Sequence, residues 1–177
     1  MSVTSFSSAV LRSAAPRTVL VTTAGLTALL LSTSAATASA DHSAAMAYGC
    51  SGDLVGTWPV PMKDLLTGGT YYRSDIKLFY NSRTGWNCAV LVKRPGKPRY
   101  GVRTPMAIEM YNGTWADDNL KKRNYDQDSG RFKYHAGPVR VYGKYMCVGI
   151  VARHDDSEGP DNGEYNGYRK VDGVACR

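Results

Sequence analysis

Three histidines are the side chains in this sequence best suited to proton transfer near neutral pH: His42, His135 and His154. His135 and His154 could act as general bases if Asp128 or Asp155 lay within hydrogen-bond distance. No Gly-x-Ser-x-Gly motif supplies a nucleophile, and the cysteines are expected to be oxidised. We therefore predict a non-enzymatic protein, with a small hydrolase built on His135 or His154 as the weaker alternative.

The densest positive charge lies in residues 93–99, Lys-Arg-Pro-Gly-Lys-Pro-Arg. The Pro-Gly step predicts a turn, so we expect Lys93, Arg94, Lys97 and Arg99 at an exposed, charged tip. Such a tip attracts polyanions, and the twelve tyrosines of the chain offer stacking surfaces beside it. An anionic polymer of the cell wall or spore surface is the expected partner, in preference to nucleic acid. A secreted protease inhibitor acting through residues 93–99 is the alternative, although no cysteine flanks this loop to brace it.

Tryptophan could supply a platform for carbohydrate. Trp86 follows a predicted turn and Trp115 opens a polar segment, so these two are the tryptophans we expect to be exposed. Burial is the commoner fate of tryptophan, and it is the alternative here.

The acidic residues 155–164 invite a calcium interpretation. Pro160 occupies the position of the third side-chain ligand of an EF-hand loop, and no helices are predicted on either side. We expect a solvated hairpin loop, and no metal ion or other cofactor.

Four cysteines, Cys50, Cys88, Cys147 and Cys176, predict two disulfides, because their wide spacing does not suit a zinc site. Four cysteines allow three pairings. We expect Cys88 to pair with Cys147, because both lie in apolar strand runs, and Cys50 to pair with Cys176, which would close the two ends.

Alternating apolar residues and frequent turn signals predict an all-β fold, a small disulfide-linked sandwich or barrel of about eight short antiparallel strands. Polar residues 115–129 are expected to form a long loop or one short helical turn. The expected extended segments are residues 54–60, 75–80, 87–92, 104–111, 131–134, 139–142, 145–152 and 165–171.

Two of these segments predict which side chains point inward. Met106, Ile108 and Met110 share one face and should enter the core. In the preceding strand Cys88 shares a face with Val90 and Val92, which places its sulfur inside.

The first 40 residues have the pattern of a secretory signal peptide: two arginines, an apolar stretch, and Ala38-Ser39-Ala40 before the cleavage point. Residues 41–49 are small and polar and predict a flexible N-terminal arm, followed by a single all-β domain over residues 50–177. The whole chain carries 22 basic and 15 acidic residues, a net charge of +7, and loss of the two leader arginines leaves +5. The expected product is a basic protein outside the cell, not inserted in a membrane; the sequence leaves its oligomeric state open.

The chain resembles the spore-associated protein A family, small exported proteins of filamentous actinomycetes. The resemblance rests on residues 85–90, 104–106, 134–139 and 147–148, with cysteines near both ends of the mature chain. It implies a location on the spore or cell surface and no catalytic residues. The sequence departs from the family pattern at the basic residues 93–103, the loop 115–127 and the acidic residues 155–164.

Overall fold

The computed structural model describes residues 43–64, 66–114, 123–156 and 165–176. All of them belong to one of the two compact units of the chain, Thr33–Arg177. The predicted signal peptide, Trp115 and residues 157–164 of the acidic segment lie outside the described residues. Within the described part of the chain, no helix is long and apolar enough to cross a bilayer.

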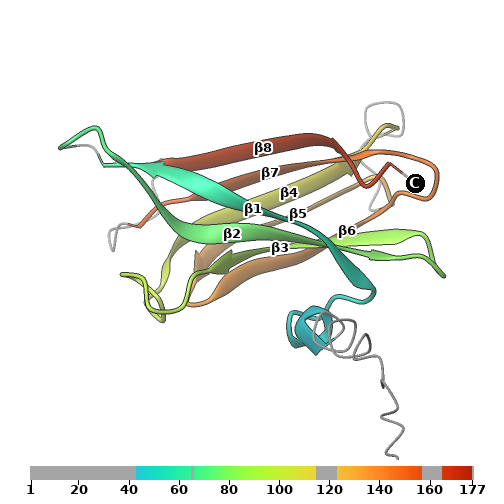
Figure 1. Cartoon of the computed structure of the whole chain (residues 1–177), viewed down its shortest axis with the longest axis horizontal. Helices are drawn as coiled ribbons and strands as arrows, with labels where there is room; N and C mark the ends of the chain where they lie inside the picture. The colour runs from blue at the N-terminus through green and yellow to red at the C-terminus, as the bar shows by residue number, and fades with distance from the viewer. Residues whose placement is uncertain (1–42, 65, 115–122, 157–164, 177) are drawn as a thin grey trace, which may run out of the picture. The chain divides into compact units, whose positions relative to one another are not determined.

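Eight antiparallel strands form one sheet that curls into a nearly closed barrel (Figure 1). The prediction of an all-β domain of about eight antiparallel strands is confirmed. Around the barrel the order is β5-β4-β7-β8-β1-β2-β3-β6. The strands are β1 (Asp53–Lys63), β2 (Thr70–Asn81), β3 (Trp86–Lys93), β4 (Thr104–Asn112), β5 (Tyr125–Phe132), β6 (His135–Tyr142), β7 (Val148–His154) and β8 (Gly167–Val174).

Alternate side chains of each strand fill the barrel interior. Met106, Ile108 and Met110 are fully buried in this core, as predicted. The same inward-facing rows end in polar residues at one end of the barrel. These residues are Ser74 of β2, Lys93 of β3, Thr104 of β4 and His154 of β7, and all four are buried.

Side chains close the gap between β5 and β6, the two strands at the ends of the sheet order. The carboxylate of Asp128 accepts the Gly137 amide N–H at 2.7 Å, and the carboxylate of Asp126 accepts the Arg140 amide N–H at 2.8 Å. These bonds satisfy edge amides that would otherwise be exposed to pairing with another strand.

The prediction of a loop through residue 129 was wrong over its last five residues, because β5 begins at Tyr125. Its register pairs Glu109 with Gln127 and Ala107 with Ser129. This strand is polar because it lies at the end of the sheet order, where its aspartates accept hydrogen bonds from backbone amides of β6. Its composition therefore resembles that of a loop.

Both predicted disulfide pairings were wrong. Cys50 bonds Cys88, and Cys147 bonds Cys176. Cys88 lies on the outer face of β3 in a small cluster with Cys50, Phe79 and Val90, apart from the barrel core. It therefore cannot face Cys147 across the interior.

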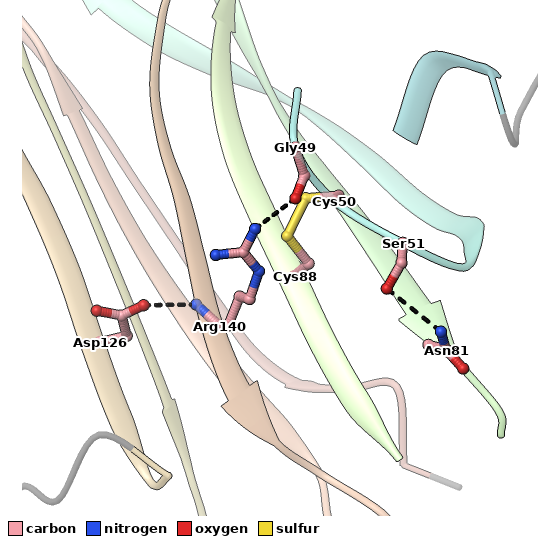
Figure 2. Close-up of a disulfide and its surroundings, with 7 residues drawn as sticks. All are labelled: Gly49, Cys50, Ser51, Asn81, Cys88, Asp126 and Arg140. Carbon is pink, nitrogen blue, oxygen red and sulfur yellow. Dashed lines mark hydrogen bonds between the residues drawn. A yellow bond between two sulfur atoms is a disulfide. The ribbon is translucent and has the colours of Figure 1, made fainter. Parts of the chain in front are cut away.

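The arm predicted to be flexible is ordered from residue 43. Residues 43–47 form a short helical turn, and Ala45 is fully buried in the outer cluster that contains Cys88. Figure 2 shows how this segment is fastened: the Cys50–Cys88 bond joins it to β3, and the Arg140 guanidinium donates to the carbonyl oxygen of Gly49. The arm is ordered, despite its small and polar residues, because the disulfide at Cys50 and the apolar cluster beside it hold it against β3.

Candidate functional site

The basic loop predicted to be a charged tip connects β3 to β4, over residues 94–103, at the end of the barrel that carries the buried polar residues. Lys93 does not belong to its exposed part, contrary to the prediction. Its side chain is 2 % exposed, and its ammonium group donates to the carbonyl oxygens of Val102 at 2.7 Å, Phe132 at 3.0 Å and Arg99 at 3.3 Å. Lys93 supports the loop from below.

Three hollows follow one another around the base of this loop. The first, of about 320 Å³, and the second, of about 210 Å³, share Arg94 in their walls. The second and the third, of about 220 Å³, share Tyr134 and His135. We call this series of three hollows the basic groove.

Positive charge dominates the lining of the basic groove. Eight basic residues line it, against Asp75 as the one acidic residue among the described lining residues. The basic residues are Arg73, Lys77, Lys93, Arg94, Lys97, Arg103, Arg131 and Lys133. Five tyrosines also line it: Tyr48, Tyr71, Tyr72, Tyr100 and Tyr134.

Acidic residues fix two of the arginines. The Arg94 guanidinium binds Asp75 with two hydrogen bonds, of 2.8 and 2.5 Å, and this bonding raises the Arg94 pKa. Arg73 makes an ion pair with Asp156, whose carboxylate also accepts the Tyr71 hydroxyl at 2.9 Å. These bonds hold the guanidinium groups in place beside the hollows.

Tyrosine rings stand between the cations. Tyr100 and Tyr134 pack with their ring centroids 5.2 Å apart, and each ring is close to half exposed. The Arg94 guanidinium lies 5.6 Å from the ring centroid of Tyr72. Exposed rings in a cationic groove can stack on planar or apolar parts of a ligand while the cations bind its negative groups.

The pKa of Lys93 reflects its burial and the positive charges around it. Burial, followed by the charges of Arg131 and Arg99, lowers this pKa from 10.5 to about 8. A bound anion would relieve this repulsion.

The structure does not bring Trp86 to the predicted basic site. Trp86 is the first residue of β3 and Lys93 the last, so the strand separates them by about 23 Å. The Trp86 ring packs against Tyr142, centroid to centroid at 6.1 Å. Trp58, partly buried, packs against the core.

The two described histidines occupy different surroundings. His154 is fully buried, and its Nδ1 and Nε2 lie 3.0 Å from the Ser74 hydroxyl and 3.1 Å from the Thr104 hydroxyl. Burial lowers its pKa to about 3, and the Lys93 charge contributes. A substrate in solvent cannot reach this ring. His135 lines the basic groove, edge-on to Tyr48 at 5.5 Å between ring centroids.

Within the described residues, no three acidic, histidine or cysteine side chains gather in a way that could hold a metal ion.

Sequence reasoning located Lys93, Arg94 and Lys97 but missed most of the basic groove, and the predicted Arg99 is not among its described lining residues. Tyr72 comes from β2, whereas Arg131 and Lys133 come from the end of β5 and the turn after it. Only the barrel closure brings these positions together, so spacing along the chain carries no signal for them.

Comparisons with protein-family models, with curated proteins and with solved structures find no significant match. The resemblance to the spore-associated family therefore stays a prediction.

Proposed function

We propose that this protein acts outside the cell, without catalysis, by binding an anionic polymer of the cell wall or spore surface in the basic groove. One observation carries the proposal: eight basic residues and five tyrosines line three neighbouring hollows that share lining residues, with one aspartate among them. A chain of hollows suits an extended polymer better than a compact ligand, because successive charged units can contact successive hollows.

Two disulfides support the extracellular part of the proposal, because such bonds persist in oxidising compartments. Surface attachment is tested by washing cell walls or spores carrying the protein. We expect retention at low salt and release at high salt, because the attachment is electrostatic. Protein that stays entirely in the culture fluid would contradict surface association.

The binding proposal is tested with poly(glycerol phosphate) as the anionic probe. A variant carrying Lys97→Ser and Lys133→Ser removes one exposed cation from each end of the groove. A matched variant, Lys144→Ser with Lys170→Ser, removes two exposed cations that do not line it. Both changes lower the net charge equally, so any difference reports the site.

We expect the groove variant to weaken binding at least about tenfold and to reduce the slope of log K against log salt by about two. The control variant should change affinity by less than about twofold. Equal weakening by both variants would show that net charge alone attracts the polymer, and would overturn the site.

A protease inhibitor is the competing function, and one observation favours it: Lys93 braces loop 94–103 through two of the loop's own carbonyl oxygens. A braced loop is what a substrate-like inhibitor needs, since preorganisation reduces the cost of binding. Incubation with trypsin distinguishes the two functions. Stoichiometric inhibition would support the inhibitor, whereas cleavage of the loop without inhibition would eliminate it.

A further inference from the structure

A further hollow lies outside the barrel, on the face formed by β4, β5, β7 and β8. Its volume is about 540 Å³, larger than any one hollow of the basic groove. Its lining shares no residue with the basic groove. We call it the polar groove, and Ala107, Glu109, Ser129, Arg153 and Tyr168 are among its lining residues.

Strand register explains why this part of the sheet surface is hollow. Ser129 pairs with Ala107, Ala107 with Arg153, and Arg153 with Tyr168, so four residues form one row across four strands. The first two side chains are small, and the last two are long. The row spans about 14 Å, because neighbouring strands lie about 4.8 Å apart. Ser129 and Ala107 thus leave a trough beside a wall of Arg153 and Tyr168.

Hydrogen bonds hold Glu109 and Gln127, on the other side of the trough, in position. Glu109 makes an ion pair with Arg153, and its second carboxylate oxygen lies 3.2 Å from the Tyr125 hydroxyl. That hydroxyl also lies 2.8 Å from the side-chain oxygen of Gln127, which pairs with Glu109 in the register. Burial and the Glu109 charge raise the Tyr125 pKa, which keeps its hydroxyl protonated. The polar groups are therefore arranged before any ligand arrives.

The polar groove should bind a different class of ligand from the basic groove, because its charge has the opposite sign. Glu109 and Asp128 oppose Arg153, so the described lining carries a net charge of −1 and disfavours a polyanion. Carboxylate, amide, hydroxyl and guanidinium groups can donate to and accept from neighbouring hydroxyl groups. The half-exposed Tyr168 ring, with the Arg153 guanidinium 6.0 Å from its centroid, can pack against the C–H face of a sugar.

We propose that the polar groove binds a neutral glycan, with Tyr168 as the stacking ring and Glu109, Gln127 and Arg153 as hydrogen-bonding partners. This site is independent of the anionic polymer site and would let one domain contact two kinds of envelope polymer.

The test uses chitotetraose and cellotetraose as probes, with binding followed by amide chemical shifts of the folded protein at millimolar sugar. We expect at least one of them to shift amides of β4, β5, β7 and β8. Tyr168→Ala removes the stacking ring, and Ser129→Phe fills the trough while leaving that ring in place. Each should weaken binding at least about tenfold. Tyr145→Ala is the matched control, because Tyr145 is 82 % exposed and does not line the groove.

Three outcomes would overturn the site: no binding by either tetrasaccharide, shifts confined to other strands, or equal affinity of Ser129→Phe and the wild type. Unfolding midpoints of the variants show whether each remains folded. The Lys97→Ser and Lys133→Ser variant should bind the tetrasaccharide normally, so failure of this proposal and failure of the anionic polymer proposal are distinguishable.

Discussion

Asp128 binds Gly137 across the gap between β5 and β6, its carboxylate accepting the Gly137 amide N–H at 2.7 Å. The glycine is required on its own strand, because its φ is +92° and a Cβ there would lie 2.9 Å from the carbonyl oxygen of Ala89. The sheet therefore closes through a side chain of one end strand and a backbone position of the other. At this point the closure combines a carboxylate on β5 with a backbone amide on β6 whose positive φ favours glycine.

We predict that Asp128→Ala lowers the free energy of unfolding by about 1–3 kcal/mol, because a hydrogen bond to a charged group is lost and the Gly137 amide is left without that acceptor. Urea titration measures the loss. Ser129→Ala is the control: Ser129 is the exposed neighbour on β5, and its truncation should change stability by less than about 0.5 kcal/mol. Equal effects of the two variants would contradict a closing role for Asp128.

Lys93→Met should destabilise the protein by about 1–3 kcal/mol at neutral pH, because the ammonium group is bonded to three carbonyl oxygens under the β3–β4 loop. Lys97→Met, in the same loop but exposed, should have little effect. Thermal or urea unfolding compares the two variants. Comparable losses would mean that Lys93 does not brace the loop.

The same residue predicts a pH dependence. The Lys93 pKa is about 8 in the folded protein and 10.5 ordinarily, so the unfolded chain binds more protons between these values. This lysine's contribution to stability should therefore rise between about pH 8 and 10.5. The stability difference between wild type and Lys93→Met measures it, because tyrosine titration affects both proteins. A difference that stays constant over this window would contradict the lowered pKa.

One misassigned strand face accounts for two of the wrong predictions. In β3 the residues from Asn87 to Val92 are almost all apolar, so alternation does not show which face is inside. Ala89 and Leu91 point into the core, which places Lys93 inside with them and Cys88 outside. In β4, polar Glu109 separates the apolar positions, and the inward face was correctly predicted there. The basic groove and the polar groove depend on cross-strand register, which local pattern does not encode.

Acid should destabilise this protein through His154. Its pKa is about 3 in the folded state and 6.5 ordinarily, so the unfolded chain binds more protons between these values. The contribution of a neutral His154 is present above pH 6.5 and is lost as the pH falls towards 3, by at most about 1.4 kcal/mol per pH unit. His154→Gln should flatten this slope, because it removes the buried titrating ring. Urea titrations at several pH values check this, and identical slopes for wild type and His154→Gln would contradict it.

Removing either disulfide should lower the free energy of unfolding by a similar amount, but the two removals should differ in which residues lose hydrogen-exchange protection. The two bonds join residues 38 and 29 apart, so loop entropy predicts a loss of about 4 kcal/mol on removing either one. Of the two disulfides, only Cys50–Cys88 adjoins the helical turn 43–47, where the amide of Cys50 donates to the Ala45 carbonyl at 2.8 Å. Cys50→Ala with Cys88→Ala should therefore abolish hydrogen-exchange protection at residues 48–50 and release the Tyr48 wall of the basic groove. Cys147→Ala with Cys176→Ala is the matched control and should keep that protection; its loss in both double variants would show that global stability, and not the local tether, orders this segment.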